Sequence, residues 1–385
     1  MKKQVFSGTL FLLTMFGFSQ DSKLVNSINI ESNDNFSGFE TIEIADQQLF
    51  VLAEHWHNIK SVPKATLKLL RYLHKHANVR VLAIEHGKST AFMINEYLLT
   101  GDELMLQHIT RNTMFWAKEN RKFFKDLRAF NLTLPEKDRV IVKSIDIEYK
   151  MEAAIFMINQ FIGSKTIPDS LKTIIGEFRR MYEETKIHRE SYEGLAIMYY
   201  YDREWIQQLI IETINDLEDN SEQYIDFFDE DFTQFATMIL EMDDGLTFDY
   251  TNPNQNYRFR DRLIYKNFTE LLESYPSVGI LCPIGMRHVM KNSSIHNLEH
   301  RESSPVKGRV MNIRISALYK NFINASDLKK INYNYPKQLK VNDATLIKHI
   351  PENKILRSNK GFDYTIFINE NGVLTPFEKV LNERY

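Results

Sequence analysis

A glutamate and a histidine, three positions apart, follow an apolar run near the start of the chain. The run covers residues 48–53, and Glu54 and His57 come soon after it. A carboxylate that hydrogen-bonds to one nitrogen of an imidazole fixes its tautomer and makes the other nitrogen a better base. His57 could therefore deprotonate water or a substrate hydroxyl, with Glu54 orienting its ring. His55 would project to the other side if the strand continued through it.

A second glutamate follows the next apolar run along the chain. Residues 79–84 are largely apolar, and Glu85, His86 and Gly87 come directly after them. If the two runs form neighbouring strands, the carboxylates of Glu54 and Glu85 meet across one crevice. Two close carboxylates raise each other's pKa, so such a pair suits a shared proton or a bound cation.

A later histidine and two arginines complete the set of groups that could do chemistry. His288 follows the apolar run 278–282 after a short loop, and Arg287 stands beside it. Arg287 could hold an oxyanion or a substrate carboxylate, although the pair fits a surface arginine beside a helix-capping histidine equally well. Arg260 is a second candidate for the oxyanion. It lies in the charged segment 258–262, which also fits a solvated helix start.

The same acids and imidazoles could instead hold a metal ion. Glu54, His57, Glu85 and His288 offer the nitrogen and oxygen ligands that Zn²⁺ accepts. The reaction would then be metal-assisted hydrolysis, of a peptide as readily as of an ester. With His57 as the base, by contrast, the chain needs no cofactor.

Short apolar runs, most of them with β-branched residues, predict strands buried on both faces. They cover residues 48–53, 79–84, 140–145, 278–282, 310–315 and 364–368. Helical patterns at residues 59–76, 89–99, 102–109, 119–130 and 261–274 separate them. This alternation predicts an α/β fold with a mostly parallel central sheet flanked by helices. Because ligands collect at the carboxyl ends of such strands, the groups above are expected to meet there. Asp146, after the run 140–145, joins them or caps the next helix.

Residues 150–250 interrupt the alternation, because they have long helical patterns and no good strand. They are therefore predicted to form a large helical insertion between two parts of the α/β core, residues 46–149 and 251–385. Its many aromatic residues indicate either a lid lining an apolar pocket or the core of a helical subdomain. Residues 21–45 are expected to form a leader loop. Residues 1–20 have a basic start and a short apolar stretch, which is typical of a cleaved secretory signal and predicts a secreted or periplasmic protein.

Composition and missing motifs exclude several classes of protein. A net charge of −3 and a pI of about 6.4 give no basic excess for nucleic acid. The sequence has neither a glycine-rich phosphate loop nor a Gly-x-Ser-x-Gly nucleophile motif. The single cysteine, Cys282, lies in an apolar run and is expected to be buried rather than nucleophilic. The apolar stretch near the start is too short and interrupted to span a membrane, so no stable membrane insertion is expected.

Five segments resemble, in order, the motifs of the erythromycin esterase family. They are residues 53–58, similar to Gly-Glu-x-x-His-Gly; residues 83–85 with 94–101; Arg260-Asp261-Arg262 with Asn267; residues 279–288; and residues 362–367 with Thr375-Pro376. The likeness covers most of the chain after residue 45. Ala53 and Asn58 stand where the family has glycines, Lys60 stands where an arginine is usual, and the first histidine of the His-Asn-x-His motif is missing.

The resemblance implies an α/β core with a helical insertion and an ester-hydrolysing site. The histidine that activates water would be His57, with Glu54 and Glu85 as its acidic partners and His288 as the later histidine. His55 and Lys60, in and beside the first motif, are further candidates for contact with the substrate.

We therefore expect a secreted hydrolase that cleaves an ester or lactone of a small molecule by direct attack of water. Glu85 and His288 would bind or protonate the substrate, and Arg260 or Arg287 would hold the developing oxyanion. Two alternatives stay open: a metal-dependent hydrolase that uses the same acids and imidazoles, and a non-catalytic protein that binds a hydrophobic ligand or haem. The missing histidine of the last motif suggests the second alternative.

Overall fold

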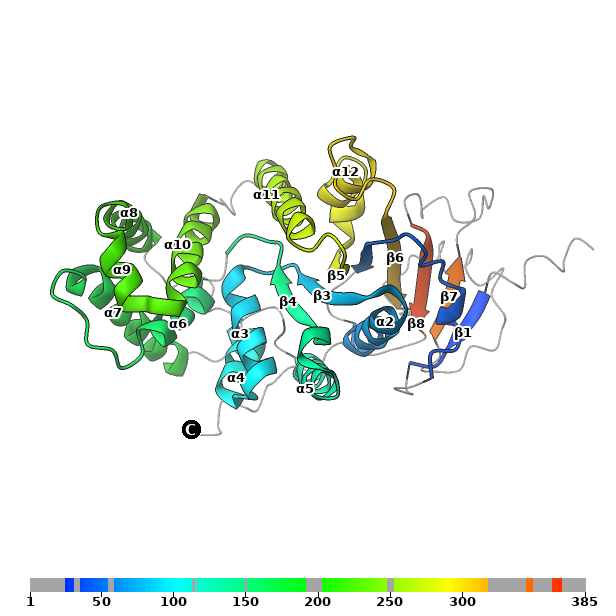
Figure 1. The fold of residues 1–385 in the computed structure, drawn as a ribbon, viewed down its shortest axis with the longest axis horizontal. Coiled ribbons are helices and arrows are strands. Elements are labelled where there is room, and N and C mark those ends of the chain that lie inside the picture. Colours follow the sequence, from blue (N-terminus) through cyan, green and yellow to red (C-terminus); the bar gives the residue numbers. More distant parts are fainter. Residues whose placement is uncertain are drawn as a thin grey trace, which may run out of the picture.

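A sheet of eight strands forms the centre of the part of the chain that the structure describes, in the order β1-β7-β8-β6-β2-β5-β3-β4 (Figure 1). The strands are β1 (Val25–Ile28), β2 (Leu49–Glu54), β3 (Val79–Ile84), β4 (Ile141–Ser144), β5 (Gly279–Gly285), β6 (Val310–Ala317), β7 (Ala344–Lys348) and β8 (Tyr364–Ile368). The six strands from β8 to β4 run parallel, while β7 is antiparallel to both β1 and β8. The expected α/β fold with a mostly parallel sheet is thus confirmed.

The computed structural model describes residues 25–30, 35–54, 59–112, 115, 117–148, 151–191, 203–247, 253–317, 344–348 and 362–368. The expected signal at residues 1–20, and His55 and His57 of the first motif, lie outside these residues.

Helices cover both faces of the sheet. Alternate residues of the central strands point to opposite sides, so these strands contribute apolar side chains to a core on each face. In β2, Phe50 and Leu52 belong to the hydrophobic core that also contains side chains of α2 (Val62–Ala77), α3 (Lys88–Thr100), α4 (Glu103–Asn112) and α5 (Lys118–Leu132). Leu49, Val51 and Ala53 pack on the other face with α11 (Pro253–Ser274) and α12 (Ser294–His300). All five of these β2 side chains are fully buried, which explains the continuous apolar run in the sequence.

The strand order differs from one expectation in a way that matters for the site. We expected the strands that end at Glu54 and Glu85 to be neighbours, but β5 lies between β2 and β3. In β5, Gly285 pairs with Glu54 in the parallel register. Strand order depends on pairing between distant segments, which the local pattern of a strand does not encode. As a result, β5 ends between the strands of the two glutamates, and the 3-10 helix η6 (Met286–Val289) that follows it carries His288 to Glu85.

Other elements also differ from the sequence-based expectation. The segment 21–45, for which we expected a loop, contributes β1 and the 3-10 helix η2 (Phe39–Thr41). No strand was expected at β7, whose residues pair with both β1 and β8. Helix α11 begins at Pro253 rather than at Asp261. Arg260 and Asp261 therefore lie two turns inside a helix instead of at its solvated start.

The insertion consists of helices only, within the residues that the structure describes: α6 (Met151–Ile162), α7 (Lys172–Ser191), α8 (Arg203–Asp219), α9 (Ser221–Phe228) and α10 (Phe232–Thr247). It lies beside α3 and α4, at the β4 end of the sheet (Figure 1). Its aromatic rings pack on one another; Phe228 stacks on Phe235 with ring centroids 4.1 Å apart. This packing fits the helical-subdomain interpretation. Tyr192 and the tyrosines at 199–201 lie outside the described residues.

Helix α10 attaches the insertion to the core near the carboxyl edge of the sheet. Lys88, at the first position of α3, pairs with Glu241 of α10 at 2.8 Å. Glu148, fully buried after β4, accepts a hydrogen bond from the backbone N–H of Ser89 at 2.9 Å. A carboxylate at this place satisfies a donor at the amino end of α3 and favours its helix dipole. The backbone of Glu148 also touches α10 at Gly245.

Replacing Gly245 by alanine is expected to lower the free energy of unfolding by roughly 1–3 kcal/mol, as overpacking does. The new Cβ would overlap the backbone carbonyl oxygen of Glu148, which cannot rotate away. Gly176→Ala in α7 is the matched control, because nothing lies within 4 Å of its Cβ position. Alanine in a helix interior should make that variant more stable by roughly 0.5–1 kcal/mol. Urea unfolding of both variants measures the difference, and equal shifts would contradict the close approach.

Among the described helices, none has the length and apolar character that a membrane crossing requires.

Candidate active site

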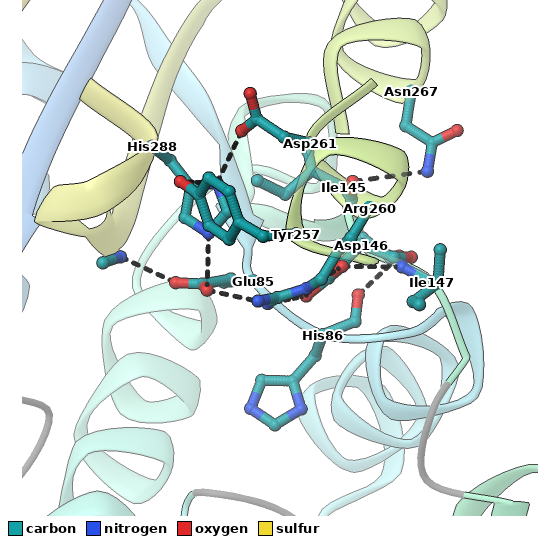
Figure 2. A network of polar contacts seen from close by, with 12 residues as sticks. Glu85, His86, Ile145, Asp146, Ile147, Tyr257, Arg260, Asp261, Asn267 and His288 are labelled. Carbon is teal, nitrogen blue, oxygen red and sulfur yellow. Dashed lines mark hydrogen bonds and ion pairs between the residues drawn. The ribbon is translucent and has the colours of Figure 1, made fainter. Parts of the chain in front are cut away.

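An arginine and two carboxylates form the centre of a polar cluster at the carboxyl edge of the sheet (Figure 2). Arg260 reaches down from α11 and donates from Nε to both oxygens of Asp146, at 2.8 and 3.0 Å, while its Nη2 also contacts Asp146. The same Nη2 donates to Oε1 of Glu85 at 2.8 Å. Asp146 is fully buried and Glu85 is 7% exposed. Planar guanidinium binds carboxylates in this bidentate way, and its charge offsets the cost of burying two acids.

Glu85 is held through both of its carboxylate oxygens. Besides Arg260, Oε1 contacts Nε2 of His288 at 3.2 Å. Oε2 accepts a hydrogen bond from the backbone N–H of Gly285, at the end of β5, at 2.6 Å. Hydrogen bonds from charged and backbone donors favour the ionised form of a carboxyl group and fix its orientation. Glu85 therefore joins β3, β5 and α11 as one rigid unit.

His288 lies between two carboxylates and carries a positive charge. Its Nδ1 contacts Oδ1 of Asp261 at 2.8 Å, and the hydroxyl of Tyr257 lies 3.4 Å from the same nitrogen. Burial alone would lower the pKa of His288, but the hydrogen bonds to Asp261 and Glu85 outweigh it and raise the pKa to about 9. At neutral pH the ring is thus an imidazolium that donates hydrogen bonds, which suits a proton donor and excludes a general base.

The stability of the protein should depend on the charge of His288. Its pKa in the fold, about 9, lies above its ordinary value of 6.5, so folding favours the protonated ring. This stabilisation is fully present below pH 6.5 and is lost as the pH rises through 9. We expect the difference in Tm between the wild type and His288→Gln to shrink over that range, measured by circular dichroism. A difference that stays constant from pH 6 to pH 10 would contradict the charged imidazole.

A cavity of ≈ 80 Å³ opens beside this cluster. The residues that line it come from the carboxyl ends of three strands and from α2 and α5: Glu54, Val62, Pro63, Thr66, Leu82, Ile84, Glu85, His86, Phe115, Asn120, Phe123, Phe124 and Pro283. The ring of His86 points away from the ion-paired cluster and packs on Phe115, with ring centroids 4.5 Å apart (Figure 2). The cavity therefore combines two carboxylates and an imidazole with a mostly apolar wall.

The structure brings together three of the four residues proposed for catalysis, as far as they are described. Glu54 and Glu85 line one cavity even though β5 separates their strands. His288 contacts Glu85 directly. The fourth residue, His57, follows Glu54 by three positions and lies outside the described residues, as does His55.

The residues proposed for substrate binding are more dispersed. Arg260 is engaged with Glu85 and Asp146, so it holds the site together rather than offering its charge to an oxyanion. Arg287 is exposed, and its guanidinium lies 4.3 Å from the ring centre of Tyr257. Lys60 lies 3.9 Å from Glu119 at the surface, a contact that contributes little.

Two members of the cluster were not recognised as functional in the sequence. Asp261 was interpreted as part of a charged helix start, and Tyr257 was not considered. They are four positions apart and therefore share one face of α11, with Arg260 beside them. That spacing was the available signal, but it becomes meaningful only when the helix is known to begin at Pro253.

Cys282, expected to be a buried apolar residue, is fully buried in β5. Burial raises the pKa of its thiol, and the nearby charges of Glu85 and Glu54 act in the same direction. A thiol held in its protonated form is a poor nucleophile.

The described residues contain no group of three acidic, histidine or cysteine side chains arranged to hold a metal ion. In the alternative ligand set, both ring nitrogens of His288 contact carboxylates, and the Arg260 guanidinium occupies one oxygen of Glu85. A metal ion at this point would have to displace a cation that is already bound. The place of His57 in such a set lies outside the described residues.

No protein-family model and no curated protein sequence matches this chain. Solved structures do resemble it. A mutant of the erythromycin esterase EreC, in its open conformation, is similar over 92% of this chain and 99% of its own, with a TM-score of 0.60 and 12% identity. The chain has the fold of EreC. A protein from Bacillus cereus is similar over 91% of this chain and 96% of its own, with a TM-score of 0.55 and 16% identity.

A protein described as a succinoglycan biosynthesis protein is also similar in structure to this chain. It is similar over 92% of this chain and 96% of its own, with a TM-score of 0.58 and 11% identity. At such identities the likeness establishes the fold alone. It confirms the fold that the sequence motifs implied, and leaves the chemistry to be argued from the site.

Proposed function

We propose that this chain is a hydrolase that cleaves an ester or lactone of a small molecule by direct attack of water. One observation carries the proposal: the buried carboxylate of Glu85 joins the imidazolium of His288 and the guanidinium of Arg260 at the wall of the cavity that Glu54 also lines. A buried imidazole whose pKa is raised by carboxylate partners, beside a cavity, is typical of functional sites in enzymes.

In the proposed reaction, His57 takes a proton from water while the water oxygen bonds to the carbonyl carbon. Glu54, which precedes His57 at the end of β2, orients the base. The bond from the carbonyl carbon to the ester oxygen then breaks. The leaving alkoxide takes its proton from the pair formed by Glu85 and His288, because Glu85 lines the cavity and Nε2 of the protonated His288 lies 3.2 Å from Oε1 of Glu85.

No covalent nucleophile is part of this scheme. Cys282 is a buried thiol, and the sequence lacks the serine elbow that serine esterases use. The scheme also uses no metal; the contacts that occupy both nitrogens of His288 support this choice. Arg260 and Asp261 act through Glu85 and His288, and we call them positioning residues. We further propose that the enzyme works outside the cytoplasm, on the basis of residues 1–20.

The test is turnover of a panel of small esters and lactones by protein purified without chelators and without a metal-affinity tag. Ester cleavage by protein that elemental analysis finds free of metal supports the proposal. Cleavage that a chelator removes and Zn²⁺ restores would replace it with the metal-dependent reaction. Tight binding of haem or another hydrophobic ligand, with no turnover across the panel, would replace it with a binding function.

A further inference from the structure

The cavity at the carboxyl edge of the sheet is larger than ordinary packing leaves and small for a substrate site. Protein interiors contain few voids larger than a water molecule, whereas this one measures ≈ 80 Å³. An apolar cavity of about 150 Å³ holds benzene. The cavity has about half that volume, so it takes a group smaller than a benzene ring.

The walls of the cavity differ in chemistry from one side to the other. The strands and their ends supply the charged groups, Glu54 and Glu85, and the imidazole of His86. The helices supply mostly apolar groups, among them Val62 and Pro63 of α2 and Phe123 and Phe124 of α5, with Thr66 and Asn120 as their polar members. Phe124 is fully buried and its ring meets that of Phe115 edge to face, with centroids 5.1 Å apart. A polar group bound at the carboxylates would thus have an apolar group next to it inside the ring-lined end.

We infer that the cavity is the subsite for a short aliphatic group of the substrate, of two to four carbons, attached directly to the ester function. The inference rests on the proposed hydrolase function and names its substrate class. A reacting ester at Glu54 and Glu85 places one of its two substituents against Phe123 and Phe124. Chains that fill the cavity gain apolar burial, and longer chains or an aryl ring exceed its volume.

Chain length is therefore expected to control kcat/KM. Each methylene that becomes buried contributes about 0.8 kcal/mol, or about fourfold in kcat/KM, until the cavity is full. We expect kcat/KM to rise from C2 to a maximum at C3 or C4 and to fall at least tenfold by C8. Two series of esters test whether the acyl or the alcohol substituent occupies the cavity. In p-nitrophenyl esters the acyl chain varies, and in alkyl acetates the alcohol varies. The series that shows the maximum identifies the substituent in the cavity, and two flat profiles would overturn the inference.

A variant that enlarges the cavity should move this maximum. Phe123→Leu removes ring atoms from the wall, and we expect the optimum to shift by one to two carbons toward longer chains. Phe130→Leu is the matched control, since Phe130 lies on the same helix and packs on His74 and Arg71, outside the cavity wall. Val62→Ala enlarges the same cavity from α2 and serves if Phe123→Leu does not fold. An optimum that stays in place in a folded cavity variant overturns the inference.

Binding without turnover distinguishes this inference from the proposed function. Butyramide and 1-butanol are neutral probes of the subsite that release no product, and saturation-transfer NMR reports their binding. If they bind the wild type and compete with short esters that are not hydrolysed, the subsite stands and the hydrolase proposal fails. If esters are hydrolysed with no dependence on chain length and the probes do not bind, the hydrolase proposal stands and the subsite fails.

Discussion

Replacing Glu85 by glutamine is expected to reduce kcat for the best ester of the panel by a factor of about 10² to 10⁴, the range for losing an acid–base group. Glutamine keeps the shape of the side chain and can still accept the hydrogen bond from Gly285. It carries no charge, so the pKa of His288 falls and the proton donor of the pair is lost. With that oxygen toward Gly285, the amide nitrogen faces the N–H groups of Arg260 and His288, so the variant loses these two hydrogen bonds as well as the charge.

Two further variants make this result specific. Glu241→Gln is the matched control: Glu241 is another buried glutamate that is paired with a cation, Lys88, but it belongs to the insertion. It should retain wild-type kcat. His57→Asn should lose turnover at least as completely as Glu85→Gln, because it removes the proposed base. Normal kcat in a correctly folded Glu85→Gln protein, checked by its Tm, would remove Glu85 from the mechanism.

Replacing Arg260 by methionine is expected to lower the free energy of unfolding by about 3–5 kcal/mol, the usual cost of removing one partner from a buried ion pair. The Arg260 side chain is 19% exposed, and the two carboxylates that it pairs with are 8% and 0% exposed. Without the guanidinium, Asp146 and Glu85 would be two buried acids close to each other. Methionine has a stem of similar length, so the loss reports the charge rather than the packing.

Arg262→Met is the control for that experiment, because Arg262 lies two positions along the same helix and is exposed. Its unfolding free energy should change by less than about 0.5 kcal/mol. A second substitution tests the cause: Asp146→Asn in the Arg260→Met background removes one of the stranded charges and should recover part of the stability. Urea unfolding measures all three proteins. If the double variant is no more stable than Arg260→Met, repulsion between the buried acids is not the reason for the loss.

Much of the fold could be predicted because its strands are short, apolar and buried on both faces. The strands at 79–84 and 364–368 have the predicted bounds, and helix α5 differs from its prediction by two residues or fewer at each end. Strands β1 and β7 were missed. They form one edge of the sheet, where polar residues such as Asn26 and Lys348 are compatible with strand structure and the apolar signal is weak.

The sequence predicted that three of the proposed residues lie close together, but not which side chains they contact. Glu54, Glu85 and His288 were expected to meet because parallel strands bring their carboxyl ends to one edge of the sheet. The partners that decide their charge come from the middle of α11: Arg260 for Glu85, and Asp261 for His288. Nothing local in the sequence shows that these side chains face the sheet, because a charged helical segment is usually solvated. For the same reason Arg260 was assigned to an oxyanion rather than to a carboxylate pair.

The place of β5 has a consequence for how the protein can be made. Leu49 of β2 pairs with Ile280, and Val79 of β3 pairs with Gly279, so residues from opposite halves of the polypeptide interlock. Until residue 285 has been synthesised, β5 is incomplete. The edges of β2 and β3 that pair with it therefore have backbone groups without their hydrogen-bonding partner. Pairing across such long stretches of sequence is slow. The cavity that Glu54 and Glu85 line is thus formed late, after residues 151–247 have been synthesised.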